Sequence, residues 1–235
     1  MENRGDLVIN GFGSSNGGQF HHVTINGKGT INSDVECVEF ECNGSGMVQG
    51  TVKMNTAQVN GMVKILGDVD GKQLTVDGSA KIDKNIHVNK LKVSGKASVG
   101  GAVKAEEIVI KGRLTVEDDC EAEMFKAESL FKVGGLLNAD EIVINLFGDC
   151  RAKEIGGETI QVKKNKASLF DLFKPNTQLE TDLIEGNKIE LEYTNAKVVR
   201  GHQIKIGPNC HIGLIEYTDE LIVDKKASIG QSKKV

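Results

Sequence analysis

Apolar and polar positions alternate along this chain in short pairs, and the whole pattern returns every 17 residues. Alternation with a period of two predicts β-strands that bury one face. Three such strands joined by three corners, near Gly27, Ser33 and Glu39, complete one period. In the first period the inward-facing pairs are Val23 and Ile25, Gly29 and Ile31, and Val35 and Cys37.

The same positions stay apolar from one period to the next. The column that begins at residue 25 contains Ile25, Cys42, Val59, Val76, Val93, Ile110, Ala127 and Ile144. A fixed period of this length indicates stacked repeats. Crossovers between parallel strands are almost always right-handed. We therefore expect an all-β fold, a right-handed parallel β-helix whose 17-residue coils form a triangular β-solenoid.

Glycine occupies one corner of six successive coils, at residues 27, 44, 61, 78, 95 and 112. The residue before it is most often asparagine or aspartate, as in Asn43-Gly44 and Asp77-Gly78. Such dipeptides favour a positive φ angle at tight bends. The column therefore predicts a left-handed backbone conformation at this corner of every coil.

The regularity of the pattern divides the chain. Residues 1–19 are rich in glycine, serine and asparagine and are expected to form a flexible N-terminal arm, from which residues 7–9 could add a strand to the first coil. We expect a regular β-helix over 20–158 and an irregular continuation over 159–230, followed by a C-terminal tail at 231–235. An excursion is predicted at 169–178, either a helix or loop packed on one face or a partner or membrane contact through Phe170, Leu172 and Phe173.

Composition narrows the class of protein. The 235 residues include 28 glycines, 2 prolines and no tryptophan, which suits a narrow core of valine, isoleucine and alanine. The formal net charge of −4 offers no basic excess for a phosphate backbone, so nucleic acid is not an expected partner. We expect a cytoplasmic protein, with membrane association as an option, because neither a signal peptide pattern nor a long apolar run is present.

Candidate chemistry is sparse. Cys37, Cys42, Cys120 and Cys150 fall in inward columns and Cys210 aligns with Ala227, so all five are expected in the core. His87 lies about four coils from His21 and His22, which excludes a three-histidine zinc site within one chain, whereas His202 and His211 could approach each other without an obvious third ligand. Carboxylate pairs such as Asp118 and Asp119 are expected at solvated corners. We predict no catalytic residue, no metal and no cofactor.

The two ends of the predicted β-helix are candidate contact surfaces. Unprotected strand edges template pairing with another chain, and monomeric solenoids need capping repeats. The last coil, Leu221 to Ile229, is as regular as an internal one. We therefore expect end-to-end association into a filament without a nucleotide. The candidate interface residues are Phe20, Val23 and Ile25 at the N-terminal end, and Leu221, Val223 and Ile229 at the C-terminal end.

The sequence also resembles a known family. The 17-residue Asn-Gly repeat, the segment Gly-Thr-Ile-Asn-Ser-Asp-Val-Glu-Cys at 29–37 and the opening Gly-Asp-Leu-Val-Ile-Asn-Gly at 5–11 resemble the bactofilins, bacterial polymer-forming cytoskeletal proteins. The resemblance covers about residues 20–155. It implies a right-handed triangular β-helix and nucleotide-free, non-polar filaments joined at the coil ends. It further implies a scaffold in cell shape, motility or envelope organisation, with other copies of the chain, a paralogue or an envelope protein as partner.

Two other functions compete with this interpretation. A hexapeptide-repeat acyltransferase is also a triangular solenoid, and Val99-Gly100-Gly101 fits one hexapeptide unit, but the 17-residue period and the lack of a histidine-bearing loop argue against it. A surface carbohydrate or ice binder would need a ladder of threonines or aromatic residues. The outward column 24 contains no such ladder: Thr24, Glu41, Gln58, Thr75, Lys92 and Val109.

Overall fold

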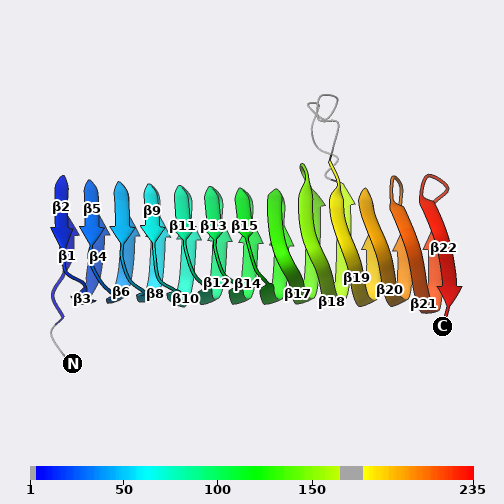
Figure 1. Cartoon of the computed structure of the whole chain (residues 1–235), viewed down its shortest axis with the longest axis horizontal. Helices are drawn as coiled ribbons and strands as arrows, with labels where there is room; N and C mark the ends of the chain where they lie inside the picture. The colour runs from blue at the N-terminus through cyan, green and yellow to red at the C-terminus, as the bar shows by residue number, and fades with distance from the viewer. Residues whose placement is uncertain (1–3, 165–176) are drawn as a thin grey trace. The chain divides into compact units, whose positions relative to one another are not determined.

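The computed structural model describes residues 4–164 and 177–235, and all of the regular structure in these residues is β-strand (Figure 1). Successive coils pair in parallel with a step of 17 residues over most of the chain, as where Val52 lies beside Val69 and Val69 beside Ile86. The predicted fold class, a parallel β-solenoid, is therefore confirmed. No helix among the described residues is long and apolar enough to cross a membrane.

The chain divides into two compact units, and the first covers residues 1–117. From residue 28 on, this unit alternates strands of four and eight residues. Its strands are β1 (Leu7–Ile9), β2 (Phe12–Ser15), β3 (Gly18–Gln19), β4 (His22–Ile25), β5 (Lys28–Ile31), β6 (Val35–Cys42), β7 (Ser45–Val48), β8 (Val52–Val59), β9 (Met62–Ile65), β10 (Val69–Val76), β11 (Ser79–Ile82), β12 (Ile86–Val93), β13 (Lys96–Val99), β14 (Val103–Ile110) and β15 (Arg113–Val116).

The eight-residue strands bend without losing their hydrogen-bonded pairing. In β6, Val35 and Cys37 are buried, Glu39 is exposed, and Phe40 and Cys42 are buried again. The alternation therefore shifts by one residue at the corner predicted near Glu39. Each coil keeps the three predicted pairs of inward residues, but two of these pairs belong to one continuous strand.

The second unit covers residues 118–235 and contains longer strands. The step between paired strands is 17 from β16 to β17, 18 or 19 from β17 to β18, 29 from β18 to β19 and 15 from β19 to β20. The step of 29 includes the predicted excursion, and Phe170, Leu172 and Phe173 lie outside the described residues. The strands are β16 (Cys120–Ala127), β17 (Leu130–Leu146), β18 (Cys150–Lys164), β19 (Leu179–Leu191), β20 (Thr194–Ile206), β21 (His211–Val223) and β22 (Ser228–Lys234).

Inward columns form the core of each unit. All eight members of the column that begins at Ile25 are buried, as predicted, and in the second unit Ile189, Ile204 and Leu221 pair in register. Burying one such aliphatic side chain contributes about 1.5 to 3 kcal/mol. The five cysteines are buried as free thiols, as predicted.

The corner glycines are required for a different reason from the one predicted. Among the described glycines only Gly11 and Gly18 have positive φ angles, so the expectation of a left-handed corner at Gly44 or Gly78 is wrong. A Cβ atom on Gly44 would lie 2.0 Å from the carbonyl oxygen of Gly27. The same clash repeats along the column, because a side chain on each of these glycines would point at the carbonyl oxygen of the glycine one coil earlier.

The asparagines before these glycines also have a structural role. The side-chain amide of Asn26 donates to Asn10 at 2.8 Å, that of Asn43 donates to Asn26 at 2.9 Å, and that of Asn60 donates to Asn43 at 2.7 Å. This ladder joins four successive coils, and stacked asparagine ladders are a known stabilising device of parallel β-structure.

Both chain ends differ from the prediction. Residues 7–19 are not a flexible arm. The strand predicted at residues 7–9 is present as β1, and together with β2 and β3 it pairs with β4, β5 and β6 to form a complete coil. At the other end, the segment 231–235 is not a free tail. Strand β22 runs on to Lys234 and pairs with β21.

Candidate assembly interfaces at the terminal coils

The N-terminal coil has one unpaired edge. Among the described residues, β1 pairs with β4 alone, β2 with β5 alone and β3 with β6 alone. The opposite edges of these three strands therefore present backbone N–H and C=O groups without strand partners. A row of such groups is a template for pairing with another chain.

Apolar side chains accompany this edge. Phe12 in β2 is 90% exposed and Val8 in β1 is 52% exposed, although both are large hydrophobic residues. Leu7 is partly exposed, and Ile9 is buried against the narrow core above Gly29. Exposed aromatic and aliphatic groups beside an open edge are typical of a contact surface.

Two of the three residues predicted for this end, Val23 and Ile25, lie one coil further in. Val23 and Ile25 are 0% exposed, because Leu7 and Ile9 of the additional coil pair with them. Their assignment to the N-terminal interface is therefore wrong. Phe20 directly follows β3 in the first coil, where its backbone N–H donates to the carbonyl of Glu36 in β6 at 2.8 Å, and its partly exposed side chain stays a candidate for this interface.

Sequence reasoning missed Leu7, Val8 and Phe12 as end residues. A signal for them exists, since Ile-Asn-Gly at residues 9–11 repeats at residues 25–27. The step between these two segments is 16 residues rather than 17, so a strict 17-residue period does not detect the repeat.

The C-terminal coil also exposes apolar side chains. Val223 is 42% exposed and Ile222 is 50% exposed, while Leu221 and Ile229 are partly exposed. Leu221 and Val223 pair with Ile204 and Ile206 of β20 on one side. The structure thus leaves the three predicted residues of this end accessible to a partner.

The last strand of this coil is polar. In β22 the residues beside Leu214, Ile215, Glu216 and Tyr217 are Gln231, Ser232, Lys233 and Lys234. Lysines on an edge strand oppose pairing with a further strand. The apolar contact surface at the C-terminal coil is therefore confined to residues 221–223 and Ile229.

A groove of about 540 Å³ lies next to this surface in the second unit. Ile222 and Val223 form one part of its lining, and Glu190 with Lys205 forms another. Lys205 at 2.8 Å and Lys163 at 3.2 Å hold the pKa of Glu190 at about 2, well below its ordinary value. The groove thus combines an apolar lip with a paired carboxylate.

The thiols and carboxylates that could serve catalysis are engaged in structure. Burial raises the pKa of Cys37 and Cys120 to about 12, which makes both thiols poor nucleophiles. At the corner occupied by Asp118 and Asp119, a side-chain oxygen of Asp119 accepts the backbone N–H of Leu136 at 2.8 Å.

Of the five histidines, only His21 and His22 lie beside each other in the described residues. His87 lies 3.5 Å from Asp70 on the neighbouring coil. His211 pairs with Asn195, seven residues along β20 from His202, so these two histidines are not neighbours. Within residues 4–164 and 177–235 one group could hold a metal ion, consisting of Asp6, His21 and His22.

Comparison with known proteins gives two relatives. The chain is 60% identical over 231 residues to the protein "Uncharacterized protein YhbE" of Bacillus subtilis (strain 168), a match that covers 97% of this chain and 98% of that protein. It is 43% identical over 83 residues to "Uncharacterized protein YhbF" of the same organism, which covers 35% of this chain and 34% of that protein. No family model matches the chain. No solved structure matches it either.

Proposed function

We propose that this chain, which belongs to the family of the Bacillus subtilis protein YhbE, is a structural protein that polymerises through the terminal coils of its β-solenoid. The observation that carries the proposal is the unpaired edge of β1, β2 and β3 with Phe12 exposed beside it. A β-solenoid is compatible with such a role, because each coil offers the next one the same hydrogen-bonding edge and the same core.

Energetics favour contact at the coil ends. Backbone groups at a free edge already bond to water, so pairing them contributes little net free energy each. The larger gain comes from removing apolar surface from water, at about 25 cal/mol for each Å² buried. Phe12 and Val8 at one end and Ile222 and Val223 at the other supply that surface.

The resemblance to bactofilins supports the same role. Its residues include the Asn-Gly corners, and in this structure they form close coil contacts and an amide ladder. We propose on this basis a cytoplasmic, nucleotide-independent scaffold rather than an enzyme, serving cell shape, motility or envelope processes. Its partners would be further copies of the chain, a paralogue, or an envelope protein or membrane surface.

A charge placed at the open edge tests the proposal. Phe12→Glu should abolish filaments seen by negative-stain electron microscopy while the circular dichroism spectrum keeps its β-sheet shape. The matched control is Met62→Glu, because Met62 is 61% exposed in β9, away from the terminal coils. This control should assemble like the wild type. Filaments of Phe12→Glu indistinguishable from those of the wild type would reject the assigned end.

A further inference from the structure

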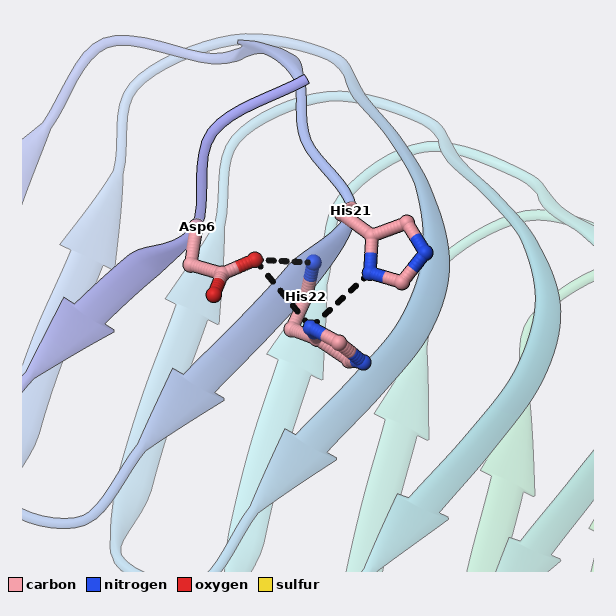
Figure 2. Close-up of side chains that lie close together, drawn as sticks. All are labelled: Asp6, His21 and His22. Carbon is pink, nitrogen blue, oxygen red and sulfur yellow. Dashed lines mark hydrogen bonds and ion pairs between the residues drawn. The ribbon is translucent and has the colours of Figure 1, made fainter. Parts of the chain in front are cut away.

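Three side chains with metal-binding atoms meet beside β1 and β4 of the N-terminal unit (Figure 2). His22 Nδ1 lies 3.0 Å from His21 Nδ1 and 3.1 Å from Asp6 Oδ1. All three potential ligand atoms lie within 4.8 Å of one another. The two imidazole rings meet edge to face, with 4.2 Å between their centroids.

The β-ladder holds these residues in place. Asp6 directly precedes β1, and the pairing of Leu7 with Val23 sets Asp6 beside His22 at the start of β4. The backbone N–H of His21 donates to the carbonyl of Gly5 at 2.9 Å, and the backbone N–H of His22 donates to Asp6 Oδ1 at 3.1 Å. The cluster is therefore built on paired backbone rather than on a free loop.

The two close contacts at His22 Nδ1 cannot each have a hydrogen bond of their own, because this atom carries either one proton or one lone pair. A carboxylate oxygen only accepts hydrogen bonds, and a neutral imidazole carries one proton on one of its two nitrogens. If His22 Nδ1 carries the proton and donates to Asp6, His21 Nδ1 faces an N–H that is already engaged. If His22 Nδ1 carries no proton, its lone pair faces the Asp6 carboxylate. A cation placed among the three atoms would satisfy all of their lone pairs together.

A second carboxylate favours the tautomer that a metal requires. Glu39 on the next coil lies 3.5 Å from His22 Nε2, on the far side of the ring from the cluster. A proton on Nε2 would face this carboxylate and leave Nδ1 free as a ligand. Histidine ligands commonly have such an outer carboxylate partner, which orients the ring and raises its basicity.

The spacing also fits tetrahedral coordination. With a zinc-to-nitrogen distance of about 2.0 to 2.1 Å, neighbouring ligands of a tetrahedral zinc ion lie about 3.3 Å apart. Two of the three separations, 3.0 and 3.1 Å, are close to this value, and the third, between His21 and Asp6, is within 4.8 Å. Imidazole and carboxylate ligands suit zinc and related divalent ions. We propose that Asp6, His21 and His22 bind one divalent transition-metal ion of the zinc class, with a fourth position open to water or to another ligand.

The bound ion would fasten the first coil to the second. Asp6 belongs to the segment that leads into β1, whereas His21 and His22 lead into β4. An ion that binds the folded chain alone adds to stability by mass action. Zinc should therefore raise the midpoint of thermal unfolding of the first coil, independently of whether the protein forms filaments.

Metal titration of the full chain tests the inference. Chelator-treated protein is titrated with Co²⁺, whose absorption spectrum reports coordination number and thiolate ligands, and the ion is then displaced by Zn²⁺. We expect one Co²⁺ per chain in a four-coordinate spectrum without thiolate charge-transfer bands. Asp6→Asn and His22→Gln should lose this site, and Glu39→Gln should weaken it by about 10- to 100-fold.

The matched control is His87→Gln, because His87 also lies beside an aspartate on a neighbouring coil, with Nδ1 3.5 Å from Asp70. This variant should bind Co²⁺ like the wild type and show the same zinc-dependent rise in unfolding temperature. No uptake by the wild-type chain at millimolar Co²⁺ would overturn the inference. Equal binding by Asp6→Asn and His22→Gln, or a thiolate spectrum, would overturn it as well.

Discussion

The carbonyl oxygen of Gly61 lies 2.0 Å from the point that a Cβ atom on Gly78 would occupy. No side chain fits there unless the two coils move apart. Gly78→Ala should therefore lower the free energy of unfolding by about 3 kcal/mol, as overpacking of a close contact does. Urea denaturation followed by circular dichroism measures the change.

The control for this substitution is Gly5→Ala, because a Cβ atom on Gly5 would meet nothing within 4 Å. Its stability should differ from that of the wild type by less than about 0.5 kcal/mol, the range of ordinary surface substitutions. Equal stability of Gly78→Ala and Gly5→Ala would contradict the close-approach explanation of the glycine column.

The buried cysteines predict chemical inertness. Burial raises the pKa of Cys120 to about 12 and that of Cys150 and Cys210 to about 11, so the reactive thiolate is scarce at neutral pH. In native buffer none of the five thiols should react with a disulfide reagent on the time scale on which all five react in denaturant. Rapid titration of even one thiol in the native protein would show that its coil opens.

The ion pairs of Glu190 predict a dependence of stability on pH. The folded pKa of about 2 lies below the ordinary value of 4.5, so the stabilisation is fully present above pH 4.5 and is lost as the pH falls from 4.5 through 2. Glu190→Gln should cost about 1 kcal/mol of unfolding free energy at pH 7, the scale of a solvent-accessible ion pair. The difference from the wild type should vanish near pH 2.

Exposed Glu158 in β18 offers the matched glutamate-to-glutamine control for this experiment. The free energy of unfolding of Glu158→Gln should equal that of the wild type across the same pH range. A loss of stability in Glu190→Gln that stays constant from pH 7 to pH 2 would assign the effect to packing rather than to charge.

The core could be predicted from the sequence because its chemistry repeats. Val59 and Val76 occupy the same inward position on successive coils, and each must be apolar for the same reason. The corner at Gly78 was identified correctly as a position but with the wrong cause. Residue identity indicates that glycine is needed, whereas only the stacked backbone shows that the space is taken by a carbonyl oxygen.

The N-terminal coil was harder to predict because its step differs by one residue. Ile9 pairs with Ile25 at a separation of 16, so a strict 17-residue frame leaves Phe12 outside the solenoid and allows Leu7 only as part of an added strand. The same displacement concealed the metal-binding cluster, since Asp6 becomes a neighbour of His22 only when β1 is paired with β4. The cluster combines residues from two coils, and no local sequence motif identifies it.

The symmetry of the filament junction can be read from two end variants. Phe12→Glu blocks the N-terminal coil and Val223→Glu blocks the C-terminal coil, where Val223 is partly exposed. A non-polar filament has junctions between like ends, so each variant alone should form dimers through its intact end. Analytical ultracentrifugation measures the species.

A head-to-tail filament would give the opposite result. Each variant alone would then be a monomer, because every junction needs one end of each kind, and dimers would form only when the two variants are mixed. The resemblance to bactofilins predicts the first outcome, in which dimers form separately and mixing changes nothing.

The central claim is that the chain polymerises through its terminal coils without a nucleotide. Electron microscopy and sedimentation of the purified wild-type protein in nucleotide-free buffer, over a range of protein and salt concentrations, test it most directly. We predict filaments above a critical concentration, with a monomer pool that stays constant as more protein is added. Dispersed monomers at every protein and salt concentration would contradict the account.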